Sequence, residues 1–242
     1  MNNIYEFPKT SHELMLLSYR KLATASSSKT GHGPSNAVDG NECTFWSSKT
    51  SDVGEWLCVD LAAAKNVFAV KLDSSTCENN PSILGSIDND KFELLFDGKK
   101  ERIPKSKTIV FDHGLRLRFI KLVFNSPSNE CFEINSLNVL GFGNGNPPKK
   151  VETPFSVKST ENSATICWNK VSTAIGYRIR FGFDAENLEF SKTVYGDDCA
   201  NIEWLSETTN QCYYAVDSFN ENGVTAGDVK PILLTTSKNH KI

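Results

Sequence analysis

The chain has 242 residues, which is long enough for two domains that each bury a core of their own. Its formal net charge of −3 and pI near 5.9 give no electrostatic basis for binding nucleic acid or an anionic membrane. No run approaches the ~18 apolar residues that a membrane-spanning helix needs, and the N-terminal segment lacks the basic and apolar regions of a signal peptide. These features predict either a cytoplasmic protein or a piece of a longer chain whose targeting segment lies elsewhere.

The only segment with a helix-like pattern lies near the N-terminus. In "SHELMLLSY", residues 11–19, the apolar residues Leu14, Leu16 and Leu17 can share one face of a short helix. Residues 1–22 as a whole are expected to form an extension that precedes the first domain.

Strand-like alternation dominates residues 23–142. The apolar runs are short, rich in β-branched and aromatic residues, and separated by turn clusters such as "DGNE" and "FDGKK", which predicts an all-β sandwich or barrel. The runs are "EWLCVDL", "VFAVKL", "KFELLF", "TIVF", "LRLRFIKLVF" and "INSLNVLGF". Trp56 in the first run is expected to pack in the core, as is Trp168 further along the chain.

A stretch dense in glycine and proline, "GFGNGNPPKKVETP" at residues 141–154, cannot continue a sheet, so a domain boundary with a linker at 143–150 is predicted there. Its G-x-G-x-G spacing, followed by two prolines, excludes a dinucleotide-binding turn. Beyond it, seven strand-like runs in about 85 residues predict an immunoglobulin-like sandwich over 151–237. Residues 238–242 are expected to form a tail.

The cysteines are odd in number, and none has the C-x-x-C spacing or a nearby histidine that a zinc site requires. They are Cys43, Cys58, Cys77, Cys131, Cys167, Cys199 and Cys212. Three of them, Cys58, Cys167 and Cys212, alternate with apolar residues in strand-like runs. We therefore expect free thiols that act as small apolar side chains, and no disulfide framework.

Several motifs of the first domain occur in the order of a known family. They are "ATASSS", "SNAVDGNECTFWSS", "GEWLCVDL", "LRLRFIKLVF" and "CFEINSLNVLGF". With these motifs residues 23–142 resemble the discoidin family (coagulation factor 5/8 C-type), which includes the family 32 carbohydrate-binding modules. The resemblance implies a jelly-roll β-sandwich with a galactose-binding-like fold, and residues 72–90 depart most from the family.

The second domain resembles fibronectin type III through Trp168, Tyr177 and "YAVDSFNENG" at 214–223, although Cys212 occupies the position of a tyrosine in those folds. Together the two domains resemble the C-terminal region of bacterial family 43 glycoside hydrolases. That resemblance implies a non-catalytic accessory pair, a monomer whose partner is an oligo- or polysaccharide or a catalytic domain absent from this chain. It also implies a secreted, periplasmic or cell-surface location. An adhesion or protein-interaction module is the alternative.

The discoidin resemblance implies a structural calcium ion in the loop that "AVDGNECT" matches. Calcium takes roughly 6–8 oxygen ligands, and carboxylates, hydroxyls and carbonyls of this loop can supply them together with a carboxylate from a late strand. The expected ligands are Ala37, Asp39, Asn41, Thr44 and Glu133. The ion would tie the loop to the late strand and hold Phe45 and Trp46 against the core. The alternative is an Asx-turn at Asp39 without an ion.

The galactose-binding members of the family carry a histidine directly after the tryptophan of this motif, with an arginine and an asparagine in later loops. Here the histidine position is Ser47, and no arginine occurs between Arg20 and Arg102. The candidate glycan-binding residues are His32, Ser47, Ser48, Lys49, Asn79 and Asn80. The alternative is that these are ordinary solvated loop residues.

An enzyme is not expected, because the sequence has no G-x-S-x-G, no H-E-x-x-H and no phosphate-binding loop. Its close carboxylates lie side by side in turns, where they cannot face one another across a cleft as glycoside hydrolysis requires. The polar loops of the first domain also argue against insertion into a membrane.

Overall fold

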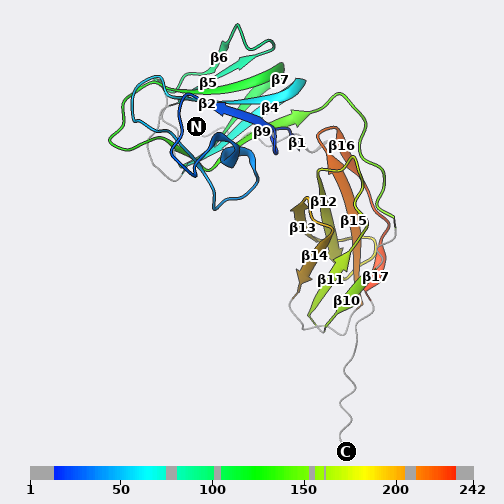
Figure 1. Cartoon of the computed structure of the whole chain (residues 1–242). Coiled ribbons are helices and arrows are strands. Elements are labelled where there is room, and N and C mark those ends of the chain that lie inside the picture. The colour runs from blue at the N-terminus through cyan, green and yellow to red at the C-terminus, as the bar shows by residue number, and fades with distance from the viewer. Residues whose placement is uncertain are drawn as a thin grey trace, which may run out of the picture. The chain divides into compact units, whose positions relative to one another are not determined.

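The computed structural model describes residues 14–74, 81–100, 105–152, 156–160, 162–204 and 211–232. The chain divides into two compact units, Met1–Asn144 and Gly145–Ile242. Both are built from β-strands, so the all-β class predicted from the sequence is confirmed (Figure 1). None of the described residues forms a helix that could span a bilayer.

The first unit is a β-sandwich with nine strands and one 3-10 helix among its described residues. They are β1 (Met15–Leu16), β2 (Leu22–Ala25), the 3-10 helix η1 (Pro34–Val38), β3 (Trp46–Ser47), β4 (Trp56–Asp73), β5 (Pro81–Ser86), β6 (Glu93–Phe96), β7 (Ser106–Phe124), β8 (Glu133–Ile134) and β9 (Ser136–Phe142). All pairings are antiparallel. Six strands are ordered β1-β9-β4-β7-β5-β6, β2 pairs with β4, and β3 pairs with β8.

The two long strands β4 and β7 pair along most of their length, which exceeds the usual strand length severalfold. Register shifts between Asp60 and Lys65 and between Val67 and Ala69 interrupt this ladder, and such bulges bend a strand. Ala62 within the first shift has a φ of 67°, and its N–H donates to the Asp60 carboxylate at 2.8 Å. This local bond stabilises a left-handed conformation that alanine rarely adopts.

Core residues of the first unit come from the inward side of each strand, as a period of two requires. Leu57, Val59, Ile120 and Leu122 are fully buried. Trp56 precedes Leu57 and therefore points to the other face of the sheet, where it is half-buried. The prediction that Trp56 packs in the core is wrong for that reason.

The helix expected at 11–19 is not formed by the described part of that segment. Met15 and Leu16 instead form β1, which pairs with Gly141 and Leu140 of β9. Met15 and Leu17 are buried while Leu16 is half-buried, so the apolar residues alternate with a period of two. A free edge of the sheet decides the conformation of this short run, overriding its local pattern.

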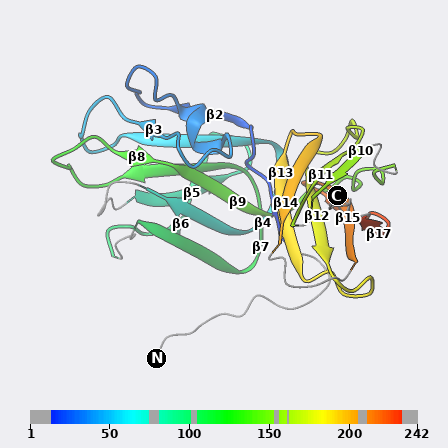
Figure 2. The same ribbon diagram turned by 90° about the horizontal axis from the view of Figure 1, so that it is seen from below.

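The second unit, seen from below in Figure 2, is also a sandwich of two antiparallel sheets. Its strands are β10 (Ser156–Ser159), β11 (Ser163–Cys167), β12 (Gly176–Gly182), β13 (Phe190–Tyr195), β14 (Cys199–Glu203), β15 (Cys212–Asn220), β16 (Gly223–Thr225) and β17 (Lys230–Ile232). The three-stranded sheet is ordered β10-β11-β14. The other is ordered β13-β12-β15-β16, with β17 also paired to β15.

Trp168 lies in the core of the second unit, as predicted, and its ring centroid is 5.1 Å from that of Tyr177. The Tyr177 hydroxyl accepts a hydrogen bond from Val171 N at 2.7 Å, which ties the loop before β12 to the core. The glycine- and proline-rich stretch is also attached to this unit. Ser218 Oγ donates to Lys149 O at 2.7 Å, and Thr225 Oγ1 donates to Pro148 O at 2.6 Å.

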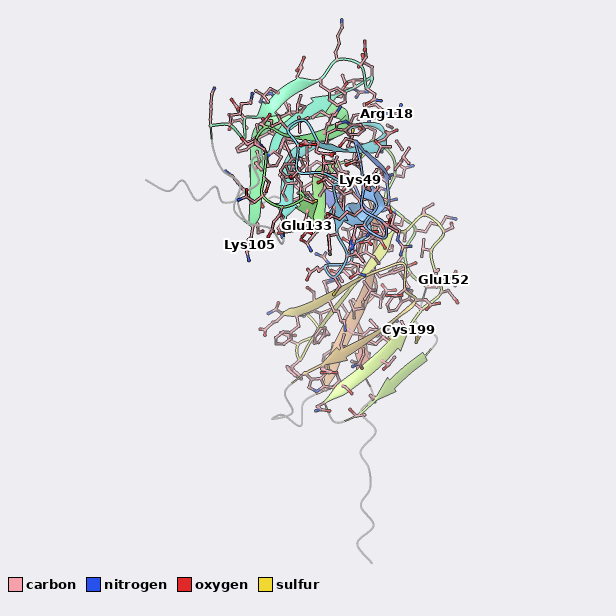
Figure 3. All side chains as sticks on the ribbon, turned by 60° about the vertical axis from the view of Figure 1, so that its left-hand side comes forward. Lys49, Lys105, Arg118, Glu133, Glu152 and Cys199 are labelled. Atoms are coloured by element: carbon pink, nitrogen blue, oxygen red, sulfur yellow. A yellow bond between two sulfur atoms is a disulfide. The ribbon has the colours of Figure 1, made fainter. Side chains whose placement is uncertain are left out.

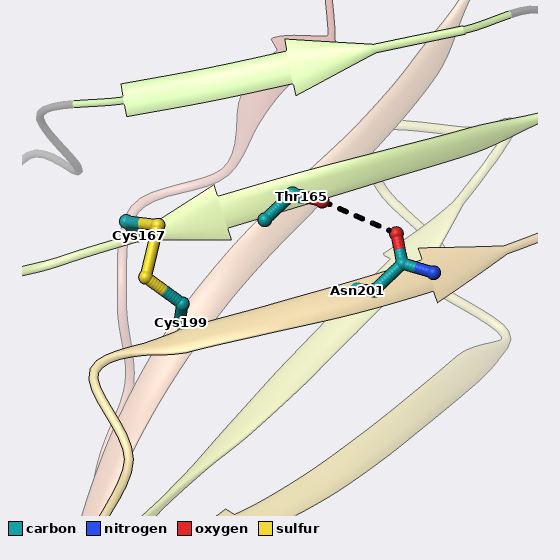
Figure 4. Close-up of a disulfide and its surroundings, with 4 residues drawn as sticks. All are labelled: Thr165, Cys167, Cys199 and Asn201. Carbon is teal, nitrogen blue, oxygen red and sulfur yellow. Dashed lines mark hydrogen bonds between the residues drawn. A yellow bond between two sulfur atoms is a disulfide. The ribbon is translucent and has the colours of Figure 1, made fainter.

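A disulfide joins Cys167 of β11 to Cys199 of β14, so the prediction that Cys167 is a free thiol is wrong (Figure 4). The two cysteines are directly opposite in the ladder, with their Cα atoms 4.1 Å apart. Cys167 shares the outward side of β11 with Thr165, whereas Ile166 points into the core. The predictions for Cys58 and Cys212 are confirmed, because both are buried free thiols.

Candidate functional site

Two loop segments of the first unit lie antiparallel at one end of the sandwich. Lys29 N donates to Ser47 O at 2.9 Å, and Ser47 N donates to His32 O at 3.2 Å. On its other side, β3 pairs with β8, with Trp46 opposite Ile134 and Ser47 opposite Glu133. The segment 27–32, strand β3 and strand β8 therefore lie side by side, although they come from three distant parts of the sequence.

An aromatic pair stands at this end. The rings of His32 and Phe45 stack with their centroids 4.2 Å apart and 22° between their planes, and both residues are half-buried. The Asn36 side-chain amide holds the pair in place, since it donates to Phe45 O at 3.1 Å and to Gly31 O at 3.2 Å. The pair thus presents an imidazole and a phenyl ring to solvent from a fixed backbone.

The other predicted glycan-binding residues differ in their accessibility. Ser47 and Ser48 are buried, and the Ser48 hydroxyl donates to Thr50 O at 2.6 Å and accepts from Phe132 N at 2.9 Å. Lys49, labelled in Figure 3, follows them in the sequence and is exposed. Asn79 and Asn80 lie outside the described residues. The structure brings His32 and Lys49 to one end, while the two serines support that end from within.

Sequence reasoning missed the group that anchors these loops. Glu55, almost fully buried, accepts hydrogen bonds from Ser27 Oγ and Thr50 Oγ1, each at 2.7 Å, and from Ser26 Oγ. Ser27 Oγ in turn accepts from Lys49 N at 2.9 Å. Burial acts to raise the pKa of the Glu55 carboxyl, but these hydroxyl donors outweigh burial and hold the pKa below its ordinary value of 4.5. No local sequence pattern marks Glu55, because its hydroxyl donors lie in other segments of the chain.

Trp46 closes the interior side of the same end. Its ring is fully buried, and Nε1 donates to Ser27 O and to Ser28 Oγ, each at 3.1 Å. Trp46 therefore packs in the core as predicted, whereas its neighbour Phe45 stays half-buried against His32.

The loop that precedes β3 gathers oxygen atoms around one hydroxyl. Thr44 Oγ1 lies 2.8 and 3.0 Å from the two carboxylate oxygens of Asp39, 2.8 Å from Asn41 O and 3.5 Å from Asn36 O. Asn41 N also donates to Asp39 Oδ1 at 2.8 Å, which forms an Asx-turn. Gly40 between them has a φ of +78°, and a Cβ there would lie 2.8 Å from the Tyr19 ring.

A hydroxyl has one proton and can donate it to only one of these four acceptors. In the other contacts, the Thr44 oxygen lies close to oxygen atoms that can only accept hydrogen bonds. These are carbonyl oxygens of the loop and the Asp39 carboxylate. Carboxylate, carbonyl and hydroxyl oxygens are ligand types that Ca²⁺ takes, so Asp39, Asn41 and Thr44 could supply three of its roughly 6–8 ligands. The same contacts also form an Asx-turn closed by the Thr44 hydroxyl, without an ion.

The other two predicted ligands lie on elements that border this loop. Ala37 is buried in η1, directly before it, and Glu133 lies on β8 opposite Ser47 (Figure 3). Glu133 O accepts a hydrogen bond from Ser74 Oγ at 2.6 Å. The structure thus brings the strand of Glu133 beside the strand that ends the loop, across a separation of many residues in sequence.

Comparison with known families matches residues 23–137 to the F5/8 type C domain. This match supports the discoidin-type resemblance predicted for this part of the chain. No curated protein matches the chain.

Solved structures of several bacterial modules are similar to about half of the chain. A chitosan-binding module of a chitosanase/glucanase from Paenibacillus sp. IK-5 is 22% identical, with a TM-score of 0.49, and the match covers 54% of this chain and 99% of the module. A family 32 carbohydrate-binding module from C. perfringens, solved with galactose, is 25% identical, with a TM-score of 0.45 and coverages of 53% and 98%. A fucose-binding module from Streptococcus pneumoniae is 17% identical, with a TM-score of 0.46 and coverages of 54% and 100%.

Proposed function

We propose that this chain is a non-catalytic accessory pair of a carbohydrate-active enzyme and that its first unit binds glycans at the loop end around His32. The stacked pair of His32 and Phe45, fixed by Asn36, is the observation that carries this proposal. The match of residues 23–137 to the F5/8 type C domain supports it.

The chemistry of binding follows from the exposed groups of the loop end. An aromatic ring stacks on the apolar face of a sugar, while an imidazole nitrogen and an ammonium group bond to its hydroxyls. Phe45 provides the ring, His32 provides the nitrogen and Lys49 provides the ammonium group. Ser47 and Ser48 are not among the proposed sugar contacts, because both are buried. The Ser48 hydroxyl instead bonds to Phe132 N, next to β8.

Calcium is part of the proposal as a structural ion. Asp39, Asn41 and Thr44 would hold it from the loop, with Ala37 and Glu133 as further ligands from η1 and β8. The ion would neutralise the carboxylates and fix the loop that leads into Phe45. Its role is stability of the loop end rather than contact with the sugar.

The second unit acts in this proposal as a fibronectin type III spacer beside a glycoside hydrolase catalytic domain that is not in this chain. Its three-stranded and five-stranded sheets and the packing of Trp168 on Tyr177 support that assignment. The Cys167–Cys199 disulfide supports a secreted, periplasmic or cell-surface location, because such bonds persist in oxidising compartments.

A glycan array probed with the full chain tests the proposal. The panel contains galactose-, fucose- and N-acetylglucosamine-terminated glycans and chitosan oligosaccharides. We expect binding that His32→Ala and Lys49→Met each weaken at least about tenfold, the loss of roughly one good polar contact. Lys91→Met, an exposed lysine between β5 and β6, is the matched control and should bind like the parent chain.

The opposing result is an array without signal together with binding of the chain to liposomes or to a protein receptor. That outcome would favour an adhesion or interaction module and would remove glycan binding at the loop end.

A further inference from the structure

A second surface of the first unit combines aromatic rings with an unneutralised positive charge. It lies on the outer face of the sheet, where β4, β7, β5 and β6 follow one another (Figure 1). In the ladder Trp56 lies opposite Val123, Cys58 lies opposite Lys121, and Lys121 lies opposite Leu84. Since the residues that flank them in sequence point into the core, these side chains point outward.

Lys121 lies between two aromatic rings on this face. Its Nζ is 4.3 Å from the ring centroid of Trp56 and 5.2 Å from that of Phe92. Trp56 and Phe92 are both half-buried, so part of each ring remains accessible. One ammonium group therefore reaches two rings that are close enough to contact a single sugar residue or its neighbour.

The charge of Lys121 is not balanced by a carboxylate among the residues that the structure describes. Arg118 on the same strand differs, because it forms a two-point ion pair with Asp60 at 2.7 and 2.8 Å. Cys58, opposite Lys121, does not supply a negative charge either. Burial raises the pKa of its thiol to about 11, so it remains neutral at physiological pH.

Exposed aliphatic side chains extend the face on both sides. Leu94 on β6, opposite Leu84, is 58% exposed, and Leu22 on β2, opposite Asp60, is 68% exposed. Contiguous exposed apolar surface with polar groups around it marks interaction sites in soluble domains. Both leucines lie on the paired strands of the sheet face, which suits an extended ligand.

We propose that this face is a second binding surface and that it takes an internal segment of a polysaccharide whose sugars carry carboxylate groups. The sugar rings pack against the parts of Trp56 and Phe92 that Lys121 leaves accessible, and one carboxylate pairs with the Lys121 ammonium. The charge complementarity selects an acidic polymer over a neutral one. This surface shares none of its contact residues with the loop end around His32, so the two sites are independent.

Isothermal titration of the full chain with polygalacturonate, and with its fully methyl-esterified form as the neutral match, tests this proposal. We expect the acidic polymer to bind at least about tenfold more tightly, and added salt to weaken its binding. Lys121→Met should remove this preference. Lys107→Met is the matched control, since Lys107 Nζ also stands over a ring, 4.8 Å from Phe96, and it should change nothing.

Two further variants show whether a loss of binding comes from this surface, from the loop end around His32 or from misfolding. Phe92→Ala should weaken both polymers without lowering the melting temperature of the first unit by more than a few degrees, whereas Trp56→Ala also removes packing. The double variant His32→Ala/Lys49→Met should keep the binding of polygalacturonate. Equal binding of the acidic and neutral polymers, unchanged binding by Lys121→Met, or loss of binding in the His32/Lys49 variant would each overturn the proposal.

Discussion

At the scale of single residues, the buried Glu55 ties together the loops that carry the candidate site. Its carboxylate accepts from Ser26, Ser27 and Thr50, which belong to both loop segments. Replacing it by glutamine keeps the shape but turns one acceptor into a donor that faces hydroxyls. We expect Glu55→Gln to lower the free energy of unfolding of the first unit by about 2–3 kcal/mol, measured by thermal or urea unfolding. Glu42→Gln, at an exposed position in the loop before β3, is the control and should be neutral.

Glu55 also determines whether the first unit gains or loses stability as the pH falls. Because the pKa of Glu55 is lower in the folded chain than its ordinary value of 4.5, the folded state binds fewer protons than the unfolded state. The stabilisation is thus complete above about pH 4.5 and is lost as the pH falls through the folded-state pKa. Melting temperatures recorded from pH 7 down to pH 3 should fall more steeply for the parent chain than for Glu55→Gln. If the melting temperatures of the parent chain and of Glu55→Gln fall in parallel, the hydroxyls of Ser26, Ser27 and Thr50 do not stabilise a charged Glu55.

At the scale of elements, the loop before β3 should respond to calcium. If an ion is held by Asp39 and Glu133, its removal leaves two carboxylates that repel one another and loosens the loop. Binding to the folded state alone adds about 2.7 kcal/mol at a calcium concentration a hundredfold above the dissociation constant. The melting temperature of the first unit should drop in chelator and recover with calcium, less with magnesium.

Two variants sharpen the calcium experiment. Asp39→Ala should abolish the response to chelator, while Asp197→Ala in the second unit should preserve it. A melting curve that chelator leaves unchanged in metal-free buffer would reduce the loop to an Asx-turn, with Thr44 donating to Asp39.

The cross-strand disulfide is expected to stabilise the second unit. It closes a loop between residues separated by 32 positions, and a loop of that length predicts roughly 3–4 kcal/mol from chain entropy. Cys167→Ala/Cys199→Ala should lower the urea midpoint of the second unit accordingly, and reduction by dithiothreitol should reproduce the effect in the parent chain. Cys43→Ser, at an exposed free thiol in the first unit, is the control. Equal midpoints for the parent chain and the double variant would mean that the bond adds nothing.

Side-chain parity explains which elements could be predicted from the sequence. The strands were predictable because their apolar runs alternate, and Trp168 follows that alternation into the core. The same alternation places Trp56 outward beside Leu57, and Cys167 outward beside Ile166. The predictions of a core Trp56 and a free Cys167 were wrong because they considered the type of residue and not the side of the strand on which it lies. At Met15 and Leu16, pairing with β9 overrides a short helical pattern, and no local signal reveals such a pairing.

At the scale of the whole molecule, the candidate site could be predicted only in part. The motif that contains Asp39 and Thr44 marked the oxygen-rich loop, and His32 was a candidate for the loop end. The stacking of Phe45 on His32, and the role of Asn36 in holding it, depend on the backbone path of both loops. The cluster around Glu55 joins residues from three segments, and sequence spacing alone cannot bring them together.

The central claim is that the loop end around His32 binds a sugar, and amide chemical-shift mapping tests it most directly. A ¹⁵N-labelled full chain is titrated with galactose, fucose and N-acetylglucosamine in turn, with calcium present. We predict that at least one sugar shifts the amides of residues 29–32 and 45–50, and that His32→Ala abolishes those shifts. Shifts confined to the second unit, or no shift with any of the three sugars at millimolar concentration, would contradict the account.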